Sequence, residues 1–236
     1  MLMAGKKYRE FQKKVDSEKQ YSLEEAVALA KSTSPSKFDA SVDIAVRLGV
    51  DPKQADQNIR GMIKLPHGGG KEVRVVVFAK PDKAAEATKA GAVDAGDDEL
   101  VKKISEGWLE FDAAVATPDM MGKVGRIGKI LGPRGLMPNP KLGTVTMDVA
   151  GAVSELRSGK REYKVDKAGI VHFSVGRVSM SVEQLHDNVM ALIDLLNKVK
   201  PASAKGIYVK TVSLTTTMGP GIRLNPAFAR GVAEAA

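Results

Sequence analysis

Two breaks that contain glycine divide this chain, and they constrain its fold more than any other feature of the sequence. The first break is Pro-His-Gly-Gly-Gly at residues 66–70, and the second is Ser-Gly-Lys at residues 158–160. Three adjacent glycines carry too much backbone entropy to continue a helix or a strand. The 236 residues are also enough for two domains that each bury a core. We therefore predict a domain boundary at the first break, and the second is a further interruption of the chain.

The segment before the first break combines helices with one amphipathic strand. Residues 6–15 predict a short charged helix, and Ser22 with Glu25 forms the pattern of a capping box at the start of a second helix. Apolar and polar residues then alternate over residues 42–50, as in a half-buried strand with one wet face. We expect residues 61–65 to pair with this strand.

The segment between the breaks follows a different pattern. A continuous apolar run at residues 73–79 is typical of a buried parallel strand. Further elements are predicted after it, with helices at about 82–89, 98–106, 119 onward and 149–157, and a strand at about 111–117. This alternation predicts a three-layer α/β unit.

The segment after the second break is expected to contain a hairpin, a long helix and a last strand. The hairpin strands are predicted at residues 163–166 and 170–175, around a turn at residues 167–169. A helix that begins at Ser181 has apolar residues at three- and four-residue spacing, so one of its faces belongs to a core. The last strand, at about residues 207–214, leads into a run of three threonines followed by Met-Gly-Pro-Gly.

The net charge of +8 suggests a polyanionic partner, and its distribution is more informative than its size. Residues 1–66 hold 12 basic and 9 acidic side chains, residues 67–159 hold 13 of each, and residues 160–236 hold 11 and 6. Within the neutral middle, residues 82–119 carry 4 basic and 10 acidic side chains, whereas residues 120–147 carry 5 basic and no acidic ones. We expect this last stretch to be locally electropositive.

The composition excludes several classes of site. The chain has no cysteine, which excludes disulfides, thiolate metal ligands and thiol catalysis. Three scattered histidines argue against a protein-built zinc centre, so no metal and no cofactor is expected. No apolar tract is long enough to cross a bilayer, and the N-terminal residues lack the apolar segment of a secretory signal. A cytoplasmic location is therefore expected.

Three patterns that could serve an enzyme have simpler interpretations. His67 and the glycines after it resemble the oxyanion-hole loop of some esterases, but the chain has no Gly-x-Ser-x-Gly elbow, so a hinge is favoured. The acidic residues 97–99 could bind magnesium or exchange protons, yet at a helix start they favour a stabilising role. Neither His172 nor His186 has a partner near it in the sequence that suits acid/base work, so we expect structural roles, although His172 could face RNA on the hairpin.

Gly122, Gly125 and Gly128 recur every three residues beside Arg126 and Lys129. Their spacing matches neither the dinucleotide nor the Walker fingerprint. It suits a turn or helix face that a partner's backbone approaches closely, with the two cations as phosphate donors. A phosphate cradle in a nucleotide-binding α/β protein and a solvated basic face are the alternatives.

Five segments together resemble the bacterial form of the ribosomal protein L-one family. These segments are SKFD (36–39), DPKQADQNIRGMIKLPHGGGK, GRIGKILGPRGLMPNPKLGTVT, YKVDKAGIVHFSVG and TTTMGPGIRLN. They occur in order and span nearly the whole chain, which argues strongly against coincidence. Gly69, at the centre of the glycine trio, departs from the family, which often has a different residue there. This departure is expected to loosen a hinge and to leave recognition unchanged.

The resemblance implies an α/β protein of two domains. A split α+β first domain is formed by both chain ends, residues 1–66 and 160–236, and an inserted three-layer, Rossmann-like second domain spans residues 67–159. With these bounds the first domain carries the whole net charge of +8, which suits the principal RNA reader of the family. The breaks then become hinge linkers, made of Pro66, His67, Gly68, Gly69, Gly70, Ser158, Gly159 and Lys160.

The resemblance also implies an RNA surface on the first domain. Its expected residues, with His172 added from the hairpin, are Lys37, Phe38, Ser41, Asp166, Lys167, Gly169, His172, Thr215, Thr217, Met218 and Gly219. Aromatic rings stack on bases, lysines neutralise phosphates, and hydroxyls bond to ribose or base edges. Without the resemblance, Phe38 could equally be a core residue, and the threonine run could be a plain strand. A secondary RNA surface is expected at Arg126, Lys129, Arg134 and Lys141.

The function implied by the resemblance is structural and not enzymatic. We expect a ribosome-associated constituent of the large subunit that binds large-subunit ribosomal RNA. It is expected to form the mobile lateral stalk near the tRNA exit site, to assist release of exit-site tRNA, and to repress translation of its own operon mRNA. When free it is expected to be a monomer without membrane contacts. The main rival is a general RNA chaperone or regulator that acts off the ribosome.

Overall fold

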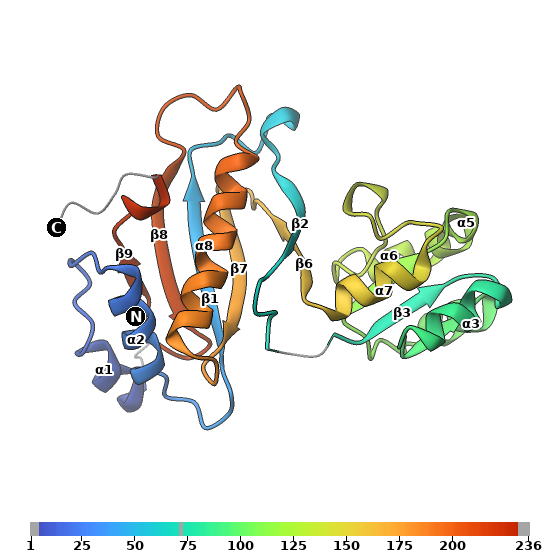
Figure 1. Cartoon of the computed structure of the whole chain (residues 1–236), viewed down its shortest axis with the longest axis horizontal. Helices are drawn as coiled ribbons and strands as arrows, with labels where there is room; N and C mark the ends of the chain where they lie inside the picture. The colour runs from blue at the N-terminus through green and yellow to red at the C-terminus, as the bar shows by residue number, and fades with distance from the viewer. Residues whose placement is uncertain (1–4, 71–72, 231–236) are drawn as a thin grey trace. The chain divides into compact units, whose positions relative to one another are not determined.

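Sheets and helices alternate along the chain, as Figure 1 shows for a computed structural model that describes residues 5–70 and 73–230. The chain divides into two compact units, hereafter unit 1 (Met1–Gly70 with Glu162–Ala236) and unit 2 (Lys71–Arg161). With these bounds unit 1 holds 21 basic and 15 acidic side chains, and unit 2 holds 15 and 13. Their net charges are therefore +6 and +2, so the excess of positive charge lies mainly in unit 1.

Unit 1 is built on a four-stranded antiparallel sheet. Its strand order is β7 (Ile170–Arg177), β1 (Ser41–Leu48), β8 (Val209–Thr216) and β9 (Ile222–Leu224). Every second residue of β1 is buried, which confirms the half-buried strand predicted from the alternation. Because β1 is paired on both of its edges, it fixes the register of the strands on either side.

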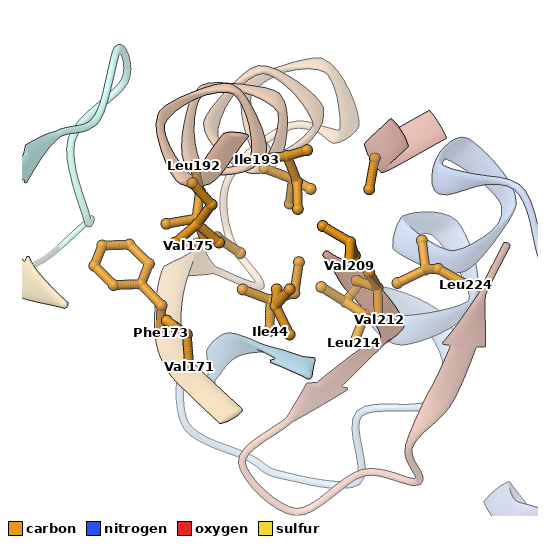
Figure 2. Close-up of a cluster of buried hydrophobic side chains, with 14 of the residues drawn as sticks. Ile44, Val171, Phe173, Val175, Leu192, Ile193, Val209, Val212, Leu214 and Leu224 are labelled. Atoms are coloured by element: carbon orange, nitrogen blue, oxygen red, sulfur yellow. The ribbon is translucent and has the colours of Figure 1, made fainter. Parts of the chain in front are cut away.

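Two helices pack against the buried face of this sheet, α2 (Leu23–Ser32) and α8 (Val182–Lys198). In Figure 2, Leu192 and Ile193 of α8 point toward Ile44 and Val212 of the sheet. Helix α8 begins with the full capping box at Ser181, and at α2 the Ser22 hydroxyl accepts a hydrogen bond from the Glu25 amide. These contacts confirm the predicted helix starts. A short helix, α1 (Lys6–Gln12), precedes them.

A second sheet in unit 1 contradicts one expectation. Strand β2 (Arg60–Lys64) pairs with β6 (Lys160–Lys164) and not with β1, because both edges of β1 are occupied by β7 and β8. The predicted hairpin is also only partly correct. Its turn is present, but β6 and β7 are joined only by a bridge between Val165 and Val171 before they separate into different sheets.

Unit 2 contains a parallel three-stranded sheet in the order β4 (Asp94–Gly96), β3 (Val75–Phe78) and β5 (Ala113–Ala116). All four residues of β3 are buried, which confirms the predicted buried parallel strand. Helices α3 (Pro81–Lys89) and α7 (Val149–Arg157) contact one another, and α4 (Asp98–Ser105) contacts β4 and α5.

The helix predicted from residue 119 onward is replaced by short turns. They are η2 (Pro118–Met120), α5 (Met121–Val124), η3 (Gly125–Ile127) and α6 (Gly128–Leu131), followed by η4 (Pro140–Leu142). Glycine disfavours a continuous helix by about 1 kcal/mol per residue relative to alanine. The apolar residues between the glycines are nevertheless buried in the core of unit 2. Among the described residues, no helix is long and apolar enough to span a membrane.

Candidate nucleic-acid interface

The face of the unit 1 sheet opposite its buried side chains carries polar and charged residues, and we call it the polar sheet face. At its centre Ala45 of β1 pairs with His172 of β7 on one side and Ser213 of β8 on the other. The other members are Ser41, Asp43, Arg47, Ser174, Thr211, Thr215 and Thr217. The hydroxyls of this face supply hydrogen-bond donors and acceptors that suit a nucleic-acid backbone, although the Ser41 hydroxyl donates to the Asp43 carboxylate at 2.9 Å.

Ser41 and Thr217 come together at the start of β1. The Thr217 amide donates to the Ser41 carbonyl at 3.2 Å, the Ser41 amide donates to Thr217 Oγ1 at 3.1 Å, and the two hydroxyl oxygens are 3.0 Å apart. The loop after β8 is therefore fixed against the first residue of β1. With Lys37, Phe38 and Met218 these two residues form what we call the sheet-end cluster.

Phe38 and Met218 are the exposed apolar members of this cluster. Their relative exposures are 59% and 58%, so the alternative of a core position for Phe38 is wrong. The loop that carries Phe38 is held by Asp39, whose carboxylate accepts from the amide and the hydroxyl of Ser179 at 3.0 and 2.9 Å. Arg177 also donates to the Asp39 carbonyl at 2.6 Å. An ordered loop thus presents an aromatic ring to solvent.

Thr215 and Gly219 shape the turn that carries Met218. Thr215 Oγ1 lies 3.1 Å from the Thr216 carbonyl and 3.3 Å from the Gly219 carbonyl, and it donates within the turn. A Cβ on residue 219 would lie 2.3 Å from Thr216 Oγ1. The turn itself therefore explains a glycine at this position, and contact of Gly219 with RNA stays a prediction.

The hairpin turn between β6 and β7 is organised by Asp166. Its Oδ1 accepts from the amides of Ala168 and Ile170, each at 2.8 Å. Donation from Ile170, followed by that from Ala168 and the nearby His172, lowers the pKa of Asp166. Asp166 is thus engaged in the turn and lies 3.7 Å from the exposed His172 ring, and Lys167 is exposed beside it.

The predicted RNA-binding residues of unit 1 thus form two groups. Ser41 pairs with Arg177, and Arg47 pairs with Ile170, so the hairpin turn lies at the opposite end of β1 from the sheet-end cluster. At a rise of about 3.3 Å per residue the two ends are roughly 20 Å apart. The polar sheet face lies between the two groups. Its residues Arg47, Ser174, Thr211 and Ser213 were not predicted to bind RNA, because only the strand register shows that they lie there.

Gly169 is buried at the end of the hairpin turn, with φ of 76°. Its carbonyl accepts from the Leu48 amide at 2.8 Å, and an added Cβ would lie 3.3 Å from the Val50 carbonyl. We expect Gly169→Ala to lower the free energy of unfolding by roughly 1 to 2 kcal/mol, because a left-handed conformation disfavours a side chain. Urea unfolding measures this change. Gly221→Ala, at a site with open space, is the control, and equal losses in both variants would contradict the strain argument.

Residues 67 and 68 of the first break are anchored by helix α8. Asn188 is fully buried, its Oδ1 accepts from the His67 amide at 3.1 Å, and its Nδ2 donates to the carbonyls of Gly68 at 3.0 Å and Val175 at 2.8 Å. The His67 ring lies 3.0 Å from Asp187, and this contact, with that of His186, lowers the pKa of Asp187. The first part of the predicted hinge is therefore attached to unit 1.

The second break ends helix α7. Gly159 has φ of 100°, and its amide donates to the Leu156 carbonyl at 3.2 Å, as in a helix C-terminal cap. Ser158 donates from its hydroxyl to the Glu155 carbonyl at 2.8 Å. These contacts account for a glycine where the helix stops, and a hinge role for both breaks stays a prediction.

The basic stretch of unit 2 presents its charges on the short turns after β5. Arg126, Lys129 and Arg134 are exposed, and Lys141 lies in η4 with a side chain outside the described part of the structure. A Cβ at Gly122 or Gly125 would meet no neighbouring atom within 4 Å. Crowding in the fold therefore does not explain these two glycines.

The enzyme alternatives have little geometric support. Lys123 donates to Asp97 at 2.6 Å and to Asp98 at 2.9 Å, so these two carboxylates are paired with a cation. At the carboxyl edge of the parallel sheet, where doubly wound folds bind nucleotides, Lys80 follows β3 and lies 3.3 Å from Asp119, which follows the neighbouring strand β5. Among the described residues, no cluster of three or more acidic or histidine side chains could hold a metal ion.

Comparison with known proteins defines the class of protein. The model of the Ribosomal protein L1p/L10e family matches residues 29–220, which is most of the chain. The chain therefore belongs to this family. That membership confirms the resemblance inferred from the five sequence segments.

Two curated relatives match nearly the full length. The large ribosomal subunit protein uL1 of Macrococcus caseolyticus is 57% identical over 230 residues, which cover 98% of this chain and 100% of the relative. The protein of the same name from Bdellovibrio bacteriovorus is 58% identical over 224 residues, covering 95% and 96%. These two relatives are named as proteins of the large ribosomal subunit.

Proposed function

We propose that this protein is a structural constituent of the large ribosomal subunit, located on ribosomes in the cytoplasm, which binds large-subunit ribosomal RNA through unit 1. Family membership and the names of the two relatives support the ribosomal role. The observation that carries RNA binding is the sheet-end cluster, where the loops of exposed Phe38 and Met218 are joined by the hydrogen-bonded residues Ser41 and Thr217 in the more basic unit. The proposal includes no covalent chemistry.

Each group of residues has a separate role in this proposal. Phe38 stacks on a base, while Lys37 and, at the far end of the sheet, Lys167 neutralise phosphates. Thr217 and Ser41 offer hydroxyls to a ribose or a base edge. Because the two groups are roughly 20 Å apart along β1, a folded RNA segment can touch both, whereas a single nucleotide cannot. Arg126, Lys129, Arg134 and Lys141 add a secondary surface on unit 2.

The proposal extends to the stalk and to regulation. Two units joined by two linkers suit a mobile lateral stalk near the tRNA exit site that assists release of tRNA. The same surface would bind a similar structure in the protein's own operon mRNA and so repress its translation. If ribosomal and messenger RNA fragments fail to compete for the protein, the repressor role is wrong. Co-sedimentation with large subunits separates the ribosomal role from that of an RNA chaperone acting elsewhere.

Binding to the stalk segment of large-subunit ribosomal RNA is expected to weaken steeply with salt, because cations on the protein release counterions from the RNA. We expect a log-log slope of several units. Lys167→Ala should reduce the magnitude of the slope by about 0.7 to 0.9, the contribution of one phosphate contact. Filter binding across a salt series measures the slope. Lys89→Ala, an exposed lysine on α3 of unit 2, should leave it unchanged, and an equal change in both variants would contradict a specific contact at Lys167.

A further inference from the structure

We propose that Met218 is an oxidation site through which peroxide weakens RNA binding, an inference that rests on the proposed function. The chain contains 10 methionines and no cysteine, so thioethers are its only oxidisable sulfur. Among the described residues, two methionines are largely exposed, Met218 at 58% and Met147 at 54%. The other described methionines are buried or partly buried, namely Met62, Met120, Met121, Met137, Met180 and Met190. Exposure therefore singles out two candidate sites.

Of the two exposed methionines, Met218 is the one whose oxidation is expected to change the affinity for RNA, because of its surroundings. It lies between Thr217, whose amide and hydroxyl are bonded to Ser41, and Gly219, whose amide donates to the Thr216 carbonyl at 3.0 Å. Hydrogen bonds on both sides thus hold the backbone of Met218 in a turn of the sheet-end cluster, and its thioether is exposed. Met147 belongs to unit 2, outside every surface proposed to bind RNA. The two methionines are therefore matched in exposure and differ in location.

The chemistry requires one oxidant, hydrogen peroxide, and no group from the protein beyond the sulfur. The thioether sulfur attacks one peroxide oxygen, the O–O bond breaks, an S–O bond forms, and water leaves after proton transfer. The sulfur loses two electrons and the peroxide is reduced by two. The product is methionine sulfoxide, which methionine sulfoxide reductases convert back to the thioether.

Oxidation changes the contact that Met218 offers. A flexible apolar side chain becomes polar and chiral, and its soft contact with the face or edge of a base is lost. A sulfur–aromatic contact contributes about 0.3 to 1.5 kcal/mol, so we expect the affinity for RNA to fall roughly 2- to 10-fold. The fold should be unaffected, because the Met218 side chain is not part of the hydrophobic core.

The test compares the full-length protein with Met218→Leu and Met147→Leu. Each is treated with hydrogen peroxide, oxidation at every methionine is quantified by peptide mass spectrometry, and binding to the stalk RNA segment is measured before and after. We expect treated wild type and treated Met147→Leu to lose affinity and to regain it after sulfoxide reductase treatment. Met218→Leu is compared with its own affinity before treatment, and it should lose none of that affinity on treatment because it has no sulfur at this position.

Two results would overturn the inference while leaving the proposed function intact. One is that RNA binding by the treated wild type is unchanged although mass spectrometry shows Met218 to be oxidised. The other is an equal loss of affinity in Met218→Leu, which would assign the effect to a different methionine. If untreated wild type fails to bind the RNA, the proposed function itself is wrong, and the inference fails with it.

Discussion

Phe38→Ala is expected to weaken binding of the stalk segment of ribosomal RNA by about 1 to 3 kcal/mol, the contribution of one stacked base. The side chain is 59% exposed, so its truncation removes a surface contact and not part of the core. The loop around it stays fixed because Asp39 is bonded to Ser179 and Arg177 through groups that the substitution does not touch. Equilibrium filter binding at constant salt measures the loss.

Ile207 offers a matched control for this measurement. It is 58% exposed and also belongs to unit 1, but it precedes β8 and lies outside the sheet-end cluster. We expect Ile207→Ala to bind RNA with the affinity of the wild type. Equal affinity in Phe38→Ala and wild type would exclude stacking at this position, and equal losses in both variants would indicate a nonspecific effect of removing exposed apolar surface.

Asn188→Ala is expected to lower the free energy of unfolding by roughly 2 to 4 kcal/mol, because it removes three hydrogen bonds at a buried position. The His67 amide and the carbonyls of Gly68 and Val175 lose their side-chain partner together. The attachment of the first break to unit 1 should also loosen. Urea unfolding monitored by circular dichroism measures the stability, and hydrogen exchange at His67 reports the local opening.

Asn197 on the same helix is the control for this second variant. Its side chain is exposed and donates one hydrogen bond, to the Ala229 carbonyl at 2.8 Å. Asn197→Ala should lose about 1 kcal/mol or less. A stability of Asn188→Ala close to that of Asn197→Ala would show that the buried amide does not anchor the break.

The sequence predicted correctly those helices and strands that are specified by residues close together in the chain. The alternation of β1, the apolar run of β3 and the capping box of α8 each specify the burial or the start of an element within a few residues. In each case the propensity, the hydrophobic pattern and the cap favour the same structure, which makes the prediction dependable.

Features that depend on distant residues could not be predicted in this way. The partner of β2 is decided by which strands already occupy the two edges of β1, and this follows from pairings far apart in the chain. The turns that replace a helix after Asp119 arise because glycines and buried apolar residues compete within the same stretch. The partner of β2 is therefore not specified by any short segment, whereas the glycines that interrupt the helix lie within the segment itself.

The candidate site also contains residues that could be predicted from the sequence and residues that only the structure reveals. The resemblance predicted Phe38, Thr217 and Met218, and the structure brings their loops to one end of a sheet, while their contact with RNA stays a prediction. It also grouped Asp166 and Gly169 with the RNA-binding residues, and both have roles in the hairpin turn that need no RNA. The other residues of the polar sheet face, such as Arg47, Thr211 and Ser213, were missed, because only the strand register brings them together.

Ultraviolet crosslinking of the full-length protein to the stalk segment of ribosomal RNA, followed by mass spectrometry, tests the location of the interface most directly. An interface on unit 1 predicts crosslinked peptides that contain Phe38 or Met218, together with peptides from the hairpin around Lys167. Crosslinks confined to residues 122–141 of unit 2, with none at the sheet-end cluster, would contradict it and would move the RNA site to the basic turns.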